Sequence, residues 1–125
     1  MTWQHGVAVF VGAGLGGVVR WMLVIVSDAR LGAAFPWGTL IANVVGSFVI
    51  GVVAGYLVLH ASPFWRLFWM VGVLGGFTTF SAFSLQTVEM AIAARWVPAL
   101  LYVALSVVLC VGAAVGGVLL GRTLV

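Results

Sequence analysis

Charged residues are scarce in this sequence: only 6% of its 125 residues are charged, and 65% are hydrophobic. A soluble domain of this length has too little polar surface to cover so much apolar material. The positive charges are arginines spread along the chain, and no run of basic or acidic residues indicates a nucleic-acid partner. The composition therefore excludes an ordinary soluble domain and predicts a protein that lies in lipid.

The groups that carry acid–base and nucleophilic catalysis are equally scarce. The only carboxylate side chains belong to Asp28 and Glu89, and the single cysteine, Cys110, lies in an apolar run. One cysteine excludes an intrachain disulfide and provides no metal-ligand spacing, so we interpret Cys110 as a buried small hydrophobe. A nucleophile without a base and acids without partners predict that the chain is not an enzyme.

Four apolar segments are present, separated by short polar or proline-bearing joints. Each is long enough to cross the hydrocarbon core of a membrane, which takes a helix of about 20 residues. All six tryptophans fall at or near the segment ends, where aromatic belts form at membrane interfaces. We therefore predict an all-α membrane protein consisting of one four-helix transmembrane domain over residues 1–125. The predicted helices cover residues 6–26, 38–60, 67–94 and 98–121.

The arginines are nearly balanced between the two sides of the membrane. With four crossings, Arg66 and Arg122 lie on one side, and Arg30 and Arg95 lie on the other, where Arg20 can join them by snorkelling. The excess of positive charge that normally fixes orientation is therefore almost missing. A chain without a preferred orientation inserts both ways, and we predict an antiparallel homodimer with its two-fold axis in the membrane plane.

Glycines at four-residue spacing recur in the segments, and in lipid such pairs let helix backbones approach closely. We interpret most of them as packing within one bundle. Because four short helices form only a small bundle, some of these faces should serve an oligomer. The pairs are Gly12 and Gly16, Gly51 and Gly55, Gly112 and Gly116, and Gly117 and Gly121.

Polar side chains inside the membrane segments follow helical spacing. Thr39, Asn43 and Ser47 are four residues apart and share one face of the second segment, and Ser81 and Ser84 begin another stripe in the third. A single serine or threonine usually bonds to its own helix backbone, but an asparagine amide is costly to bury and needs a partner. Stripes of donors without carboxylates indicate a pathway for something small that accepts hydrogen bonds.

The stretch LGGFTTFSAFS, residues 74–84, predicts a break in the third helix. We expect the helix to break at Gly75–Gly76, near the middle of a segment that is longer than a straight crossing needs. Carbonyls freed at such a break need a partner, and broken helices in transport proteins use them to hold a cation such as Na⁺. Phe80 and Phe83 follow, with partial positive charge on their ring edges. They either coordinate a small, hard anion or only pack, and the residues alone favour packing.

Three motifs, in the order found here, resemble the small bacterial fluoride channels of the Fluc (CrcB) family. They are GAGLGGVVRW (12–21), GTLIANVVGSFVIG (38–51) and GGFTTFSAFS (75–84), and the fourth segment fits in length and hydrophobicity. The resemblance implies a passive, fluoride-selective channel in the cell (inner) membrane that exports cytosolic fluoride and so lowers its toxicity. It also implies a dual-topology antiparallel homodimer with two pores and a structural Na⁺ at the dimer centre.

The resemblance also implies roles for individual residues. Gly75 and Thr78 match the positions whose backbone carbonyls hold Na⁺, and Arg20 matches an arginine near the end of the first helix with a vestibule or structural role. Ala82 stands where threonine is common, and Cys110 stands where a hydroxyl is expected along the fourth helix. The implied fluoride pathway consists of Asn43, Thr79, Phe80, Ser81, Phe83, Ser84 and Ser106.

Two other functions remain open on the sequence. A proton-coupled small multidrug-type exporter needs an intramembrane carboxylate, and Glu89, the only candidate, lies near a segment end. A non-transporting structural subunit of a larger membrane complex carries no ion flux by itself and leaves the polar stripes unexplained. Fluoride and chloride efflux from liposomes that hold only this protein distinguishes these alternatives.

Overall fold

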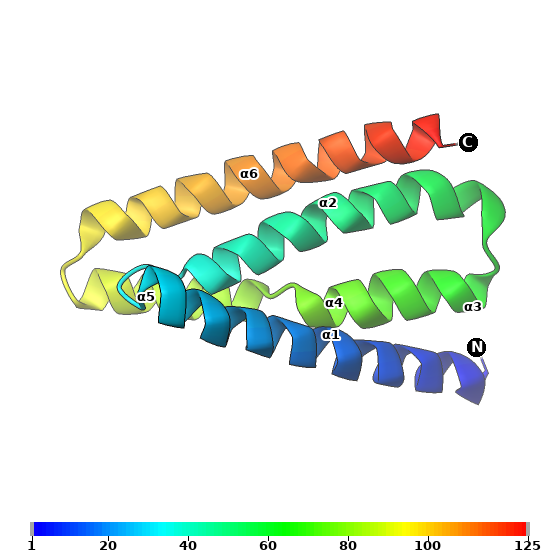
Figure 1. Cartoon of the computed structure of the whole chain (residues 1–125), viewed down its shortest axis with the longest axis horizontal. Coiled ribbons are helices and arrows are strands. Elements are labelled where there is room, and N and C mark those ends of the chain that lie inside the picture. The colour runs from blue at the N-terminus through cyan, green and yellow to red at the C-terminus, as the bar shows by residue number, and fades with distance from the viewer. Residues whose placement is uncertain (1, 125) are drawn as a thin grey trace.

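Four long helical stretches make up the part of the chain that the structure describes. The computed structural model describes residues 2–124, with the side chains of residues 57–60 excepted. The stretches are α1 (Trp3–Leu31), α2 (Trp37–His60), a composite third stretch (Pro63–Ile92) and α6 (Trp96–Thr123). Each is long and apolar enough to cross a membrane, which confirms the prediction of an all-α, multi-pass membrane protein. Both ends of the described chain lie at the same end of the bundle (Figure 1).

The third stretch is not a uniform helix. It consists of α3 (Pro63–Arg66), the π-helix η1 (Leu67–Leu74), α4 (Gly75–Phe77) and α5 (Phe80–Ile92). It begins after Ser62, which is the N-cap, with Pro63 in the first turn. Proline has no N–H, but the first turn of a helix needs none, so proline suits this position. A π-helix is uncommon and is frequently found at functional sites. Here only the short helix α4 separates it from the place where the stretch is interrupted.

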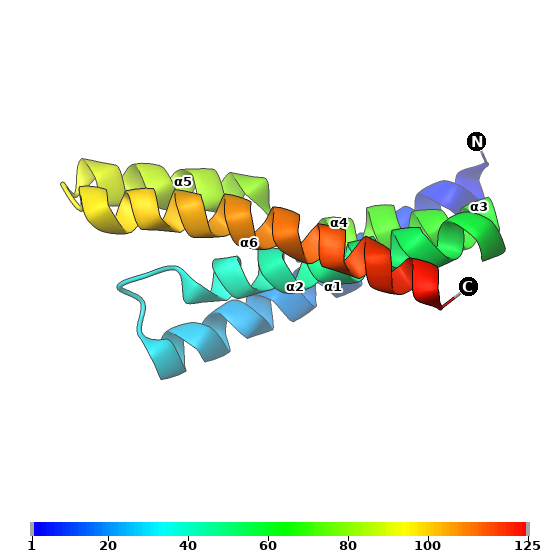
Figure 2. The same cartoon turned by 90° about the horizontal axis from the view of Figure 1, so that it is seen from above.

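The helices pack in two pairs. α1 lies along η1 and α4, and α2 lies along α6, while the separate helix α5 lies beside α6 (Figures 1 and 2). Glycines make both pairs close. A side chain at Gly12 or Gly16 would collide with the backbone of η1 and α4, and one at Gly51 or Gly117 would collide with the backbone across the α2–α6 contact. These glycines therefore pack within one chain, as predicted.

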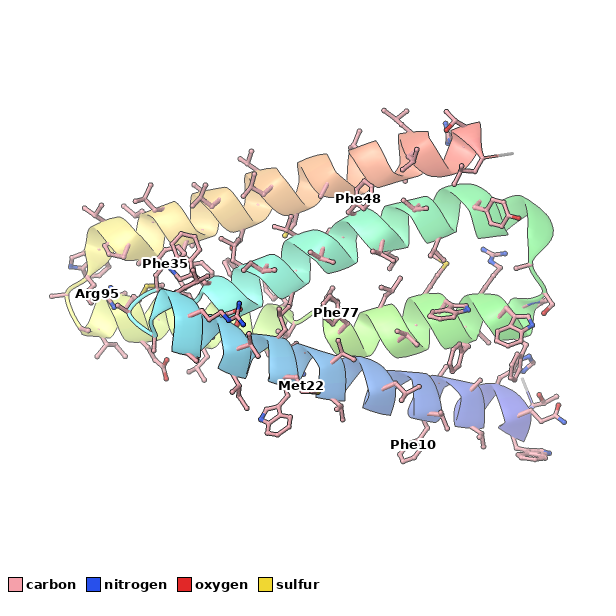
Figure 3. The ribbon with its side chains drawn as sticks, in the orientation of Figure 1. Phe10, Met22, Phe35, Phe48, Phe77 and Arg95 are labelled. Atoms are coloured by element: carbon pink, nitrogen blue, oxygen red, sulfur yellow. The ribbon has the colours of Figure 1, made fainter. Side chains whose placement is uncertain are left out.

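Not every glycine pair has a partner in the single chain. Side chains added at Gly112 and Gly116 of α6 would meet nothing within 4 Å, whereas Gly117 and Gly121 on the same helix face α2. Large apolar side chains also point outward. Phe10, for example, is 80% exposed and extends from α1 away from the other helices (Figure 3). Such surfaces need lipid or another protein to cover them.

The short loops at one end of the bundle are held together. α1 ends at Gly32, whose φ of 84° suits glycine and whose amide donates to the Asp28 carbonyl at 3.0 Å. The Arg95 guanidinium, after α5, donates to the Ala34 carbonyl in the loop between α1 and α2 at 2.6 Å. The helix ends next to these loops contribute Leu40, Met90 and Ala99 to a hydrophobic core cluster, which also includes the fully buried Tyr102.

Candidate functional site

The third membrane stretch breaks where two threonines adopt extended backbone. Thr78 has φ −86° and ψ 159°, and Thr79 has φ −153° and ψ 119°. The prediction of a break is confirmed, but its predicted position at Gly75–Gly76 is wrong. Both glycines belong to the helical turn α4, and Gly75 has ordinary helical dihedrals. Gly76 serves close packing instead, because an added Cβ would collide with the Ala13 backbone of α1.

The break is stabilised by side chains that replace the lost helical hydrogen bonds. The Asn43 amide from α2 pairs with the backbone of Thr79: its Oδ1 accepts from the Thr79 N–H at 2.7 Å, and its Nδ2 donates to the Thr79 carbonyl at 2.9 Å. The Thr79 hydroxyl accepts from the Ala82 N–H at 3.2 Å and so caps α5. Gly46 lets α2 come this close, because a side chain there would overlap the Thr78 methyl group.

These replacements change the partners of two carbonyls. In a continuous helix the N–H of Thr79 would donate to the Gly75 carbonyl, and the N–H of Ala82 to the Thr78 carbonyl. The first instead donates to Asn43, and the second to the Thr79 hydroxyl. Gly75 and Thr78, the two residues that the family resemblance connects with Na⁺, are therefore among those whose carbonyls lose their regular donors at the break.

Arg20 reaches the same break from α1. Its Nε donates to the Gly76 carbonyl at 3.2 Å, so it satisfies one backbone acceptor at the end of α4. The arginine side chain also places positive charge beside the carbonyl end of a helix, where a cation is favoured. Arg20 therefore contacts the broken helix. A structural role for Arg20, which the family resemblance implies, would use this contact.

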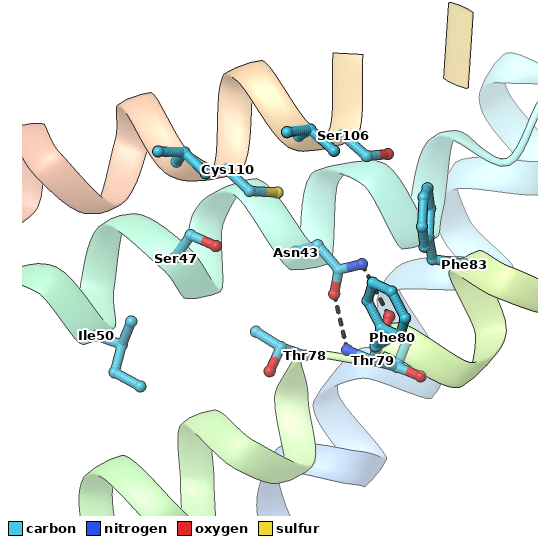
Figure 4. A pocket seen from close by; sticks show the side chains of 11 residues that line it. Asn43, Ser47, Ile50, Thr78, Thr79, Phe80, Phe83, Ser106 and Cys110 are labelled. Atoms are coloured by element: carbon cyan, nitrogen blue, oxygen red, sulfur yellow. Dashed lines mark hydrogen bonds between the residues drawn. The ribbon is translucent and has the colours of Figure 1, made fainter. Parts of the chain in front are cut away.

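A cavity of about 330 Å³, called the first cavity below, opens beside the break. Asn43 and Ser47 of α2 and Ser106 of α6 face it together with the threonines of the break and two phenylalanines (Figure 4). Of the predicted pathway residues it brings together five, which are Asn43, Thr79, Phe80, Phe83 and Ser106. Thr78, Ile50, Val107, Cys110 and Val111 complete its wall.

Phe80 and Phe83 lie one turn apart at the start of α5. Their ring centroids are 5.3 Å apart with an interplanar angle of 47°, so the two rings are tilted rather than stacked. Phe83 is half-buried, whereas 79% of Phe80 is exposed in the single chain. The first cavity is consequently walled on the Phe83 side and open on the Phe80 side.

Two predicted pathway residues do not line the first cavity. The Ser84 hydroxyl donates to the Phe80 carbonyl of its own helix at 2.9 Å. The Ser81 hydroxyl lies 3.2 Å from that of Thr79, within hydrogen-bond distance. Ser84 therefore behaves as isolated serines in helices usually do, whereas the Ser81 hydroxyl meets the side chain of a residue of the cavity wall.

Ser106 and Cys110 are four residues apart on α6 and face the first cavity from the same side. The Ser106 hydroxyl is buried, and no partner for it is found among the residues that the structure describes. A buried hydroxyl normally has a partner, so this group is available to something that enters the cavity. Cys110, interpreted as a buried small hydrophobe, is only half-buried and belongs to the cavity wall.

Ser47 is a wall residue that the predicted pathway does not include. Its four-residue spacing from Asn43 had already placed it in the polar stripe of the second segment, although the pathway implied by the family resemblance omits it. Gln86 and Tyr102 were also missed: the Tyr102 hydroxyl donates to Gln86 Oε1 at 2.8 Å, and Gln86 Nε2 donates to the Thr39 hydroxyl at 3.0 Å. No spacing pattern within one segment joins residues from three helices, so the sequence carried no comparable signal for this contact.

A second cavity of about 280 Å³ lies at the end of the bundle where the Arg95 contact joins the loops. Thr39 and Gln86 belong to its wall, together with the side chains of Asp28, Glu89 and Arg95. The first cavity is different in character. None of its described wall residues carries a carboxylate or a cation, and its polar groups are hydroxyls, a thiol and an amide. Such a set suits hydrogen bonding to a small anion better than proton transfer.

Similarity to known proteins provides evidence that does not depend on the geometry of the site. Residues 7–118 match the family described as CrcB-like protein, Camphor Resistance (CrcB). The fluoride-specific ion channel FluC of Rhizobium meliloti is 42% identical over 124 residues, which cover 98% of this chain and 99% of the relative. FluC 2 of Nitrobacter hamburgensis is 48% identical over 118 residues, covering 93% and 95%. FluC of Rhodospirillum centenum is 46% identical over 120 residues, covering 94% and 95%.

Proposed function

Because the chain belongs to the CrcB-like protein family, we propose that it is a passive, fluoride-selective ion channel, the activity for which its relatives are named. The observation that carries the proposal is the first cavity, which presents hydroxyls, an amide and two phenylalanine rings without an acid or a base. Hydrogen fluoride diffuses through lipid and ionises in a less acidic cytosol, where fluoride is trapped. A channel lets the anion leave along the negative-inside potential without any coupled proton.

Efflux from liposomes that contain only the purified protein tests this proposal. A fluoride electrode should record rapid, valinomycin-dependent fluoride release from potassium fluoride-loaded vesicles, while a chloride electrode records little release from chloride-loaded ones. Equal release of both anions would contradict fluoride selectivity. No release of either anion would favour the reading of a non-transporting membrane subunit, and release that requires a proton gradient would favour a coupled exporter.

An antiparallel homodimer is part of the proposal. It is supported by surfaces that a single chain leaves uncovered: the Phe80 ring at the open side of the first cavity, the exposed Gly75, and the unpacked Gly112 and Gly116. A second copy covering Phe80 would close the cavity on its open side.

Orientation bias tests the antiparallel arrangement. Several lysines added to the C-terminus should fix one orientation and abolish fluoride efflux, and co-expression with an oppositely biased copy should restore it. Full efflux from a population with one fixed orientation would exclude an antiparallel dimer. The same number of added glutamines serves as the control, since it lengthens the tail without adding charge.

We also propose that the carbonyls of Gly75 and Thr78 hold a structural Na⁺ at the dimer centre. The residues fit such an ion, because both carbonyls lose their helical donors at the break and oxygen ligands suit a hard cation. Two carbonyls from each chain would give four oxygens. When bound, the ion would offset the dipoles of carbonyls that have lost their helical donors. Asn43, through Thr79, and Arg20, through Gly76, hold the backbone that presents these carbonyls.

Two substitutions separate a backbone site from a side-chain site. The Thr78 hydroxyl donates only within its own stretch, to the Leu74 carbonyl at 2.9 Å, so Thr78→Ala should retain Na⁺-dependent stability of the purified dimer. Gly75→Val should lose it. An added Cβ at Gly75 would make one ordinary van der Waals contact within the single chain, 3.7 Å from the Met70 carbonyl oxygen, so a steric clash of valine is expected at the contact with the second copy. Loss of the Na⁺ effect in Thr78→Ala alone would contradict the carbonyl assignment.

A further inference from the structure

Cys110 gives the first cavity its strongest nucleophile. It is the single cysteine of the chain, it is half-buried, and it belongs to the cavity wall on α6 (Figure 4). A thiol is a much better nucleophile than a hydroxyl, and it reacts with electrophiles without an adjacent base. A cysteine alone does not define a site, so a second group has to indicate what binds beside it.

Ser106 is this second group. Its side chain is only 7% exposed, and its hydroxyl has no partner among the residues that the structure describes. The Ser84 hydroxyl, by contrast, donates to a carbonyl of its own helix, as serines in helices usually do. Ser106 and Cys110 are four residues apart and therefore lie on one face of α6. A molecule held at Cys110 that carries a hydrogen-bond acceptor would satisfy the Ser106 hydroxyl.

The remaining walls restrict the kind of molecule that fits. The first cavity has a volume of about 330 Å³, a size that small organic ligands occupy. Ile50, Val107 and Val111 give it apolar surface, and its described wall residues include no carboxylate or cation, so an organic ligand without charge is favoured. A bound metal ion fits less well, because the described part of the chain contains no group of three or more His, Cys, Asp or Glu side chains that could hold one.

We propose that Cys110 and Ser106 form a covalent modification site for small, uncharged, conjugated carbonyl compounds, such as enals, enones and maleimides. The sulfur attacks the β-carbon of the carbon–carbon double bond, a carbon–sulfur bond forms, and the π electrons shift onto the carbonyl oxygen. The Ser106 hydroxyl donates a hydrogen bond to this oxygen as negative charge develops on it. The thiol proton passes through water to the α-carbon, so no group leaves and no oxidant or reductant is needed.

The adduct would remain in the first cavity, attached to its wall. Its functional consequence rests on the proposed fluoride channel, because only there does the cavity form part of an anion path. Asn43, Phe80 and Phe83 line the same cavity, so a group attached to Cys110 would occupy space that the anion needs. Modification of this single cysteine should therefore stop fluoride efflux.

The first arm of the test measures, by intact-mass spectrometry, how fast two thiol reagents add to the purified, assembled protein. N-ethylmaleimide has carbonyl acceptors beside its reacting double bond, whereas methylmercury chloride has no oxygen. Wild type should gain one adduct per chain from either reagent, since it has a single cysteine. Ser106→Ala should slow the addition of the maleimide about two- to tenfold, the factor expected for one ordinary hydrogen bond, and should leave the addition of methylmercury unchanged.

Thr123→Ala is the matched control, because it also removes a hydroxyl from α6, one that donates to the Leu120 carbonyl of the same helix at 2.7 Å. Both of its rates should match those of wild type. Wild type also gives a comparison that needs no variant. The ratio of the maleimide rate to the methylmercury rate should be about two to ten times higher in the folded protein than in the chain unfolded in sodium dodecyl sulfate.

The outcomes of this arm that contradict the proposal are distinct. Equal slowing of both reagents in Ser106→Ala would mean that Ser106 only shapes the cavity. An unchanged maleimide rate in Ser106→Ala, or the same ratio of rates in the folded and the unfolded wild type, would mean that its hydroxyl does not contact the carbonyl. Addition that occurs only after unfolding would mean that the Cys110 sulfur is not accessible. Each of these results would overturn the proposed site.

The second arm measures fluoride efflux from proteoliposomes before and after treatment with N-ethylmaleimide, each protein compared with its own untreated sample. Efflux through wild type should fall in proportion to the fraction of chains that carry the adduct. Cys110→Ser should keep its untreated rate, because it has no thiol to modify. Complete modification of wild type without any loss of efflux would overturn the blocking role. If untreated wild type carried no fluoride, the proposed function would fail, while the mass-spectrometric arm still decided whether Cys110 and Ser106 form the site.

Discussion

Gly46 is small enough to let α2 approach the broken helix. It lies on α2, one turn after Asn43, and faces Phe77, the last residue of α4, and Thr78. An ideal Cβ at this position would overlap the Thr78 methyl group and would lie 3.2 Å from the Phe77 ring. Gly46→Ala is therefore a one-carbon change aimed at the contact between α2 and the broken helix.

The expected size of the effect follows from this geometry. Thr78 must move by about 1 Å to regain ordinary van der Waals separation from the new methyl group. A shift of this size carries Thr79 out of range of Asn43, whose two hydrogen bonds now measure 2.7 and 2.9 Å. Overpacking of this kind costs about 1–3 kcal/mol, while alanine returns about 1 kcal/mol through its better helix propensity. These two terms leave a net cost of about 0–2 kcal/mol, and the loss of two hydrogen bonds of about 1 kcal/mol each raises the expected loss of stability to about 2–4 kcal/mol.

Fluoride efflux from proteoliposomes measures the functional part. Losing two hydrogen bonds of about 1 kcal/mol each should reduce efflux at least about tenfold. Gly46→Ala/Thr78→Ser should recover much of the rate, because serine lacks the methyl group that collides but keeps the hydroxyl that bonds Leu74. Gly6→Ala is the matched control, since nothing lies within 4 Å of a side chain there. Wild-type efflux in Gly46→Ala, or no recovery in the double variant, would refute the reasoning.

Three further predictions concern the cavity wall and the helix pairs. Phe80→Ile and Phe83→Ile should each cost under about 1.5 kcal/mol in stability, and both variants should assemble normally on size-exclusion chromatography. They should carry little fluoride, because the ring edge is gone; wild-type efflux would show that the rings only pack. Asn43→Asp should also fail in efflux, since a carboxylate cannot donate to the Thr79 carbonyl and repels an anion; retained efflux would exclude that role. Gly117→Ala should lower the unfolding temperature by overlapping the α2 backbone, whereas Gly116→Ala should leave the α2–α6 contact intact; equal losses would contradict the assignment of faces.

The number and nature of the helices could be predicted from the sequence because a bilayer imposes length and apolarity on every crossing. The ends of the helices were placed less well, since polar and aromatic residues at an interface continue a helix without an apolar signal. α1, for instance, runs from Trp3 to Leu31, beyond the predicted 6–26. The π-helical part of the third stretch, η1, was not predicted, because a π-helix and an α-helix share the same composition.

The break illustrates what local rules miss. The low helix propensity of glycine placed the break at Gly75–Gly76, but tertiary contacts decide its position. A side chain at Gly76 would collide with the Ala13 backbone, and the helix opens at Thr79, where Asn43 can bond the backbone. Helical spacing placed Asn43 and Ser47 on one face of α2, and both line the first cavity. Helical spacing could not tell which serines face that cavity and which bond their own helix. Ser84, for example, belongs to a stripe with helical spacing, but its hydroxyl donates to the Phe80 carbonyl of the same helix.

Thr79 connects the two ion sites that we propose. Its N–H is taken by Asn43, and this leaves the Gly75 carbonyl without its regular donor. Its hydroxyl takes the N–H of Ala82, and this does the same for the Thr78 carbonyl while it starts the helix that carries Phe80. The hydrogen bonds that would expose carbonyls to a cation are thus the ones that aim a phenylalanine at an anion. A change at Thr79 or Asn43 cannot alter one site alone, because both sites are consequences of the same interruption in one helix.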